Sequence, residues 1–232
     1  MYGATIFTIM LTQHRLQDER LWYAPWLFKG QHASMAGLAT SGTLTHWFRD
    51  QFARDMDGEG AFAALAGEAA HSPEGAKGLV FLPYFSGERT PIHDSNAKGV
   101  IFGLNLTHGR GDIYRALLEG IACGTAHIID TYREIKEPPL AIYAVGGGTR
   151  NNVWAQATSD ISGVQQFLRR EMIGASYGDA FLAALSVNDV ALKDIVKWNP
   201  STSSIRARGE HAAAYSRQYG VFRRLYDQTR GL

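Results

Sequence analysis

The sequence predicts an α/β fold, in which strands and helices alternate along one chain. Two patterns carry this prediction: short apolar runs rich in β-branched residues recur, and stretches with apolar residues spaced three and four apart separate them. In addition, glycine-rich turns stand where several of the apolar runs end. The chain has 232 residues and no linker long enough to divide it, so we expect one domain.

The first elements are predicted within residues 4–85. Residues 4–12 read ATIFTIMLT, a run of β-branched and apolar residues that predicts a strand. A helix should begin near Ser41 or Gly42, because four large apolar residues follow at helical spacing. The other elements expected here are a strand or sheet edge at 21–28, an alanine-rich helix at 58–70 and a buried strand at 78–85.

The longest predicted element is a helix over residues 112–135, opened by Thr107 or Asp112. Large apolar residues keep a helical period along one face of it. The same period puts Arg115, Glu119 and Glu134 on the opposite, polar face. Prolines end the helix, because proline lacks the amide hydrogen that a helix interior needs. A polar loop at 86–99 and a short strand at 100–106 precede it.

The last third of the chain continues the alternation. A strand at 140–145 leads into a helix that ends near residue 162, with Asn151 or Asn152 placed to cap it. The remaining elements expected are a strand at 164–170, a helix at 176–186 and a C-terminal helix at 209–228.

Composition and charge narrow the classes of function. The net charge of +1 does not indicate a protein that binds nucleic acid or an anionic membrane surface, because such proteins carry an excess of basic residues. The apolar core of the opening segment, residues 6–11, is too short for a signal peptide, and no basic residue precedes it. Cys123 is the only cysteine, which fits a reducing compartment, so we expect a cytoplasmic protein. The eight histidines form no zinc-ligand spacing, and we predict no metal site.

The residues GGG at 146–148 are the first candidate for a binding site. They follow a predicted strand and precede a predicted helix, and ligands of open α/β sheets bind at such strand ends. Bare backbone and helix amides favour an anion or a flat ring, although a tight turn that needs glycine explains the triplet equally well. Two further small-residue turns precede helices, at 37–44 and 173–180, and one hypothesis is that all three turns converge on one ligand.

A serine hydrolase is a competing interpretation, because GASYG at 174–178 fits the G-x-S-x-G nucleophile elbow. Ser176 would be the nucleophile, Asp189 or Asp194 the acid and His211 the base. Against this interpretation, the preceding segment FLRREMI is too polar for the buried strand that leads into such an elbow. In the polar loop at 86–99, Glu88 and Arg89 either pair with each other or face a cleft.

Several ordered motifs resemble the C-terminal domain of the FGGY carbohydrate kinases, xylulokinase-like members especially. The motifs are GLVFLPYFSGERTPIHDSNAKGVIFGLNLTH, DIYRALLEGIA, AVGGGTRNNVWAQATSDISG and GASYGDAFLAAL, and together they cover nearly the whole chain. Leu117 and Asp179 depart from the usual residues. The resemblance implies an actin-like ATPase domain of the ribonuclease H-like type, with a mixed central sheet and helices on both faces.

The resemblance also implies a site for ATP or ADP. By position, Gly147 and Asn151 match the family's adenosine-side contacts, and Gly42 and His46 match contacts on the helix beside the phosphates. YGAT, at residues 2–5, matches the second phosphate loop, with Gly3 in the loop. Ala4 stands at the usual threonine, so we assign the hydroxyl role to Thr5.

The same resemblance implies that the chain is one part of a larger kinase. The family's N-terminal domain supplies the catalytic aspartate, most sugar contacts and the acid groups that bind Mg²⁺. We therefore assign no catalytic residue here, and expect the fragment alone to be inactive or to serve as a non-catalytic scaffold. The partners expected are a small sugar or polyol, the N-terminal domain and, through an exposed interdomain face, a second copy of the chain.

Overall fold

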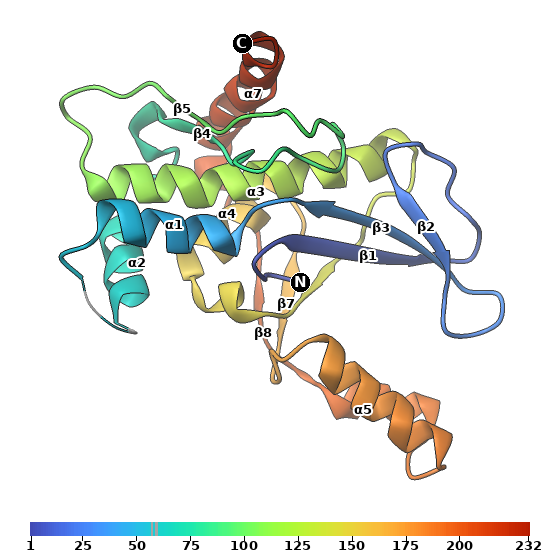
Figure 1. The fold of residues 1–232 in the computed structure, drawn as a ribbon. Helices are drawn as coiled ribbons and strands as arrows, with labels where there is room; N and C mark the ends of the chain where they lie inside the picture. Colours follow the sequence, from blue (N-terminus) through green and yellow to red (C-terminus); the bar gives the residue numbers. More distant parts are fainter. Residues whose placement is uncertain (57, 59) are drawn as a thin grey trace.

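One long helix, α3 (Arg110–Glu134), crosses the middle of the molecule, and the other elements are arranged around it (Figure 1). The computed structural model describes residues 1–56, 58 and 60–232. The other helices are α1 (Gly42–Phe52), α2 (Ala61–His71), α4 (Asn152–Ser162), α5 (Ala175–Ser186), α6 (Ile195–Trp198) and α7 (Ala212–Thr229). The strands are β1 (Ile6–Thr12), β2 (Trp22–Pro25), β3 (His32–Leu38), β4 (Val80–Leu82), β5 (Val100–Phe102), β6 (Ile142–Ala144), β7 (Gln166–Arg169) and β8 (Ser201–Ile205).

The α/β prediction is confirmed, but the expected single mixed central sheet is wrong for the described part of the chain. There the strands form three separate sheets, ordered β1-β3-β2, β4-β5 and β6-β7-β8. The first two are antiparallel, and only the third is mixed, with β6 parallel and β8 antiparallel to β7. Strand patterns along a sequence do not say which strands pair, since pairing is decided by how the elements dock.

Two strands were missed because their residues lack the usual strand composition. Strand β3 has the sequence HASMAGL and lies between β1 and β2, so backbone pairing on both edges stabilises it. Strand β8 has the sequence STSSI and pairs with β7. Strand propensity depends on the packing surface more than on the residue itself, so small and polar residues form strands where a neighbour is already in place.

The predicted helices are all present, and the expected capping contact is found at the start of α4 but not at the start of α1. Asn151 caps α4, because its Oδ1 accepts a hydrogen bond from the Trp154 amide at 3.1 Å, a contact that stabilises a helix by about 1 kcal/mol. Helix α3 begins earlier than predicted: Asp112 lies inside its first turn and accepts from the Gly109 amide at 2.8 Å. In the predicted helix 58–70, residue 59 lies outside the described residues.

The prediction of a polar outer face on α3 is wrong for two of its three residues. Arg115 is 4% exposed and Glu119 is 0% exposed, whereas the Glu134 side chain is 51% exposed as expected. The reason is that α3 is covered on that face as well, by α7 and by the chain that follows α2.

The buried charges on α3 satisfy one another. The Glu119 carboxylate accepts from Arg115 Nε at 2.8 Å, from Gln218 Nε2 at 2.7 Å and from the Tyr215 hydroxyl at 3.1 Å. Arg115 also donates to the Ser72 carbonyl at 2.7 Å. Burial raises the pKa of Glu119, and the guanidinium beside it opposes that shift. This cluster therefore joins α3 to α7 by paired charges rather than by apolar contact alone.

Helix α5 projects away from the rest of the molecule together with α6 (Figure 1). Tyr177 and Trp198 join the two helices: Trp198 Nε1 donates to the Tyr177 carbonyl at 3.2 Å, and the Tyr177 hydroxyl donates to the Trp198 carbonyl at 3.1 Å. Within the described residues, no helix combines the length and the hydropathy that a bilayer crossing needs.

Candidate functional site

A cavity of about 740 Å³ lies where the N-terminal segment meets the starts of α1 and α4 and the sides of α2 and α3. Five of the six residues predicted for nucleotide contact line it, namely Gly3, Gly42, His46, Gly147 and Asn151. Thr5 does not line it. The chain turns back at this point, with the Gly3 amide donating to the Thr5 carbonyl at 3.1 Å. The structure thus brings segments more than one hundred residues apart into one wall.

The N-terminal segment holds the two glycine turns of the cavity together. The Gly3 carbonyl accepts from the Gly42 amide at 3.0 Å and from the Ser41 hydroxyl at 3.0 Å. One residue earlier, the Tyr2 carbonyl accepts from the Gly148 amide at 3.1 Å, and the Tyr2 amide donates to the Val145 carbonyl at 2.7 Å. Residues 2 and 3 are therefore the physical link between the start of α1 and the turn that precedes α4.

The three consecutive glycines have different reasons to lack a side chain. Gly146 has φ +104°, and a Cβ there would lie 2.4 Å from the Tyr2 carbonyl oxygen. A Cβ on Gly148 would lie 2.5 Å from the Trp154 ring. At Gly147 no described atom comes within 4 Å of an added Cβ, and the residue is exposed on the cavity wall. Packing therefore explains the outer two glycines, and only Gly147 leaves space that a ligand can fill.

The amides at the start of α1 are not free to bind an anion. The Gly42 amide donates to the Gly3 carbonyl at 3.0 Å, and the Thr43 amide donates to the Ala4 carbonyl at 3.3 Å. The Thr43 side chain also lines the cavity, and its hydroxyl donates to the Ala4 carbonyl at 3.1 Å. Polar contacts to a ligand at this end must therefore come chiefly from side chains and from glycine backbone.

Helix α2 forms a wall of the cavity that the sequence analysis did not assign. Phe62, Ala63 and Ala66 line it, and the His46 ring packs edge-on against Phe62 with centroids 4.8 Å apart. Ala63 and Ala66 are three residues apart and so share a helix face. Two small residues beside an aromatic residue were the indication in the sequence that this helix forms a cavity wall. An alanine-rich helix that merely packs against its neighbours has the same pattern, so the sequence did not separate the two roles.

The charge around the cavity suits an anionic ligand. Among the described residues no carboxylate lines it, whereas the Arg150 guanidinium does. A more open hollow of about 840 Å³ adjoins it, sharing Phe62 and Arg150 and adding Arg54 and the ion pair of Arg49 with Asp50. Residues 1–56, 58 and 60–232 contain no cluster of three or more histidine, cysteine or acidic side chains suited to a metal ion.

The third small-residue turn, at 173–180, does not line the cavity. The residue before this turn, Met172, contacts the glycine turn instead, since its carbonyl accepts from the Gly146 amide at 3.0 Å. The hydrolase interpretation fails here too. Ser176 lies in the first turn of α5, well past the end of β7 at Arg169, so there is no sharp strand-to-helix elbow. His211 faces Glu74 at 3.6 Å, and no described hydrogen bond joins it to Ser176.

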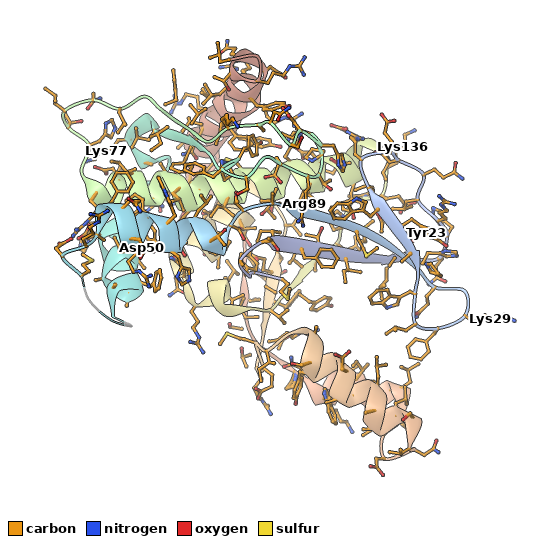
Figure 2. The ribbon with its side chains drawn as sticks, in the orientation of Figure 1. Tyr23, Lys29, Asp50, Lys77, Arg89 and Lys136 are labelled. Carbon is orange, nitrogen blue, oxygen red and sulfur yellow. The ribbon has the colours of Figure 1, made fainter. Side chains whose placement is uncertain are left out.

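Glu88 and Arg89 do not pair through their side chains in the described structure. The Glu88 carboxylate is 4% exposed and accepts two backbone amides through Oε1, from Ala39 and from Arg89, both at 2.7 Å. The Arg89 side chain is exposed (Figure 2). Glu88 thus connects the loop after β4 to the turn that precedes α1, while its Oε2 has no described partner.

Glu88 predicts a specific pH dependence of stability. Burial raises the pKa of Glu88 from its ordinary value of 4.5 to about 7. A raised folded-state pKa stabilises the fold below the unfolded pKa, and this contribution is lost as pH rises through the folded pKa. Between pH 5 and pH 8 we expect the wild type to lose about 2 kcal/mol relative to Glu88→Gln, measured by urea denaturation. If the free energies of unfolding of wild type and Glu88→Gln change with pH in parallel, the raised pKa of Glu88 is contradicted.

Comparison with known proteins places these features in a family. The family model described as the C-terminal domain of the FGGY family of carbohydrate kinases matches residues 1–187. Xylulose kinase of Escherichia coli (strain K12) is 36% identical over 196 residues, which cover 84% of this chain and 40% of that protein. Gluconokinase of Bacillus licheniformis is 30% identical over 178 residues, covering 74% of this chain and 34% of that protein.

A comparison with solved structures leads to the same kind of protein. The crystal structure of xylulose kinase from Rhodospirillum rubrum matches with a TM-score of 0.89 and 32% identity, covering 99% of this chain and 46% of that one. The chain therefore spans less than half the length of these relatives.

Proposed function

Because the chain belongs to the FGGY family of carbohydrate kinases, we propose that it is the nucleotide-binding half of an ATP-dependent kinase acting on a small sugar or polyol. The observation that supports this is the single cavity shared by Gly3, Gly42, His46, Gly147 and Asn151. The family resemblance selects these residues from separate parts of the sequence, and their convergence gives one ligand a continuous surface. We also assign the chain to the actin-like ATPase type, with a ribonuclease H-like core.

The chemistry of the cavity fits the two ends of a nucleotide. Phe62, Ala63 and Ala66 offer an apolar wall for a flat base beside the open backbone of Gly147. In this proposal the Gly3 and Gly42 side faces the phosphates, and the Thr43 hydroxyl exchanges its bond to the Ala4 carbonyl for a phosphate oxygen, in the role expected of Thr5. A hydroxyl and a positively charged rim stabilise a polyphosphate without any metal ligand from this chain.

The cavity residues do not fit Mg²⁺, which prefers carboxylate oxygens. No described carboxylate lines the cavity, so we derive no step through the metal here. Phosphoryl transfer to a sugar hydroxyl also needs a group that orients the hydroxyl or takes its proton. We propose that this chain binds nucleotide without transferring phosphate, and that the acid groups and sugar contacts belong to another part of the intact kinase.

A thermal-shift titration of the 232-residue chain with ADP and ATP tests nucleotide binding directly. At a ligand concentration about 100 times Kd, binding to the folded state alone adds about 2.7 kcal/mol of stability. For a domain of this size that predicts a rise in Tm of about 5–10 °C. Inorganic phosphate at the same concentration is the control for general anion effects. A chain whose Tm does not respond to millimolar ADP or ATP would instead favour a scaffold role.

A coupled assay with ATP and xylulose or gluconate tests the second half of the proposal. We expect nucleotide binding with no turnover above background in the isolated chain. Turnover at about 1 s⁻¹ or faster, the range of working kinases, would show that the chain carries catalytic groups of its own.

A further inference from the structure

Tyr114 is a buried residue of α3 whose side chain reaches the cavity. It is 0% exposed, belongs to the main apolar core and lines the cavity. Its ring packs against Phe48 with centroids 5.0 Å apart. Its hydroxyl is buried and has no hydrogen-bond partner among the described residues. Buried hydroxyl groups in folded proteins nearly always have a partner, so this one needs an explanation.

The two polar side chains nearest the Tyr114 hydroxyl make their described hydrogen bonds elsewhere. The Asn151 and Thr45 side chains lie close enough to the Tyr114 hydroxyl to lower its pKa, although neither is in hydrogen-bond geometry with it. The Thr45 hydroxyl donates to the Gly42 carbonyl at 2.7 Å, and Asn151 Oδ1 accepts the Trp154 amide at 3.1 Å. Burial raises the pKa of Tyr114 to about 12, so the hydroxyl keeps its proton and stays a hydrogen-bond donor near neutral pH.

A second tyrosine on the same helix shows what an ordinary structural role looks like. Tyr132 is 3% exposed, and its hydroxyl donates to Ser34 Oγ at 3.3 Å. It does not line the cavity. The two tyrosines therefore differ in one respect that matters for binding: the Tyr132 hydroxyl has a partner inside the protein, whereas Tyr114 lines the cavity and its hydroxyl has no described partner.

We propose that Tyr114 is a specificity-determining residue, whose hydroxyl donates to a ring nitrogen of the purine base of the bound nucleotide. This inference rests on the proposed function. The base is the part of the ligand that fits, because Tyr114 is fully buried beside the apolar residues of α2 and beside Trp154. A phosphate group at such a place would lose its hydration without gaining a cation. A ring nitrogen accepts a hydrogen bond at little desolvation cost.

Replacing Tyr114 with phenylalanine removes only the hydroxyl and keeps the ring that packs in the core. By isothermal titration calorimetry we expect the Kd for ADP to rise about three- to tenfold, the effect of one neutral hydrogen bond. The Tm without ligand should stay the same or rise, because the variant loses a buried hydroxyl that had no partner. Binding of inorganic tripolyphosphate, which has phosphates but no base, should not change.

The matched control is Tyr132→Phe, the same chemical change on the same helix. It should lower the Tm without ligand and leave the Kd for ADP unchanged. Equal ADP affinity in wild type and Tyr114→Phe would overturn the inference while leaving nucleotide binding intact. So would an equal loss of affinity for ADP and for tripolyphosphate. If the wild type binds no nucleotide, the proposed function fails, and the inference fails with it.

Discussion

Replacing Arg115 with methionine is expected to lower the free energy of unfolding by about 3–5 kcal/mol, as measured by urea denaturation. The guanidinium is 4% exposed and faces the fully buried Glu119 carboxylate at 2.8 Å. Without it, Glu119 either stays charged in a dry environment or takes up a proton on folding. Both outcomes oppose folding at neutral pH, and the second makes the variant relatively more stable at low pH.

The control is Arg110→Met, which makes the same substitution on the same helix. Arg110 pairs with Glu68 and Asp55 near the surface, where the partners are 33% and 66% exposed. Pairs of this kind contribute about 0–1 kcal/mol, so this variant should unfold almost like the wild type. Adding Glu119→Gln to Arg115→Met should restore part of the lost stability, because it removes the unpaired charge. If Arg115→Met and Arg110→Met lower the free energy of unfolding by similar amounts, the buried pair stabilises the fold no more than a surface pair does.

Replacing Gly147 with leucine is expected to weaken ADP binding by about 100-fold, equivalent to about 2.8 kcal/mol, with little change in Tm. A side chain at this position meets no described atom within 4 Å and extends from the cavity wall. It therefore occupies the space proposed for the nucleotide without disturbing the fold. Calorimetric titration with ADP and a thermal melt without ligand measure the two effects separately.

Two further glycine variants define what the Gly147 result means. Gly178→Leu introduces the same side chain at another open position, on α5 and outside the cavity, so both ADP binding and Tm should be retained. Gly146→Ala should instead lower stability by about 2–4 kcal/mol, because its φ is +104° and its Cβ would overlap the Tyr2 carbonyl. ADP affinity that survives in a folded Gly147→Leu variant would place the nucleotide elsewhere.

The order of the elements could be predicted from the sequence because the signals that specify them are local. Apolar spacing located α1, α3 and α7, alanine content located α2, and a β-branched run located β1. Asn151 or Asn152 was predicted to cap α4, and the Asn151 side chain makes that bond. The family resemblance selected five residues that line one cavity, because motif positions are read along the chain without knowledge of contacts. That these residues bind a nucleotide remains a prediction.

Contacts between distant segments decided the rest. Arg115 and Glu119 follow a polar-face pattern, yet Tyr215, 100 residues beyond Arg115, helps to cover them once α7 docks. Strand β3 has little strand propensity and exists because β1 and β2 pair with it on either edge. Thr5 was assigned the phosphate hydroxyl from its neighbours in sequence, but the turn at residues 3–5 keeps it off the cavity wall and Thr43 lines it instead.

The sequence by itself determined the longer helices but not the short α6, most of the strands, and the family to which the chain belongs. Those properties depend on side chains within a few residues of one another. The tertiary structure alone decided that Gly147 is open while Gly146 and Gly148 are closed by packing, and that Tyr114 lines the cavity with a hydroxyl that has no described partner. These features depend on which atoms approach from elsewhere in the chain, and that is set only when the elements dock.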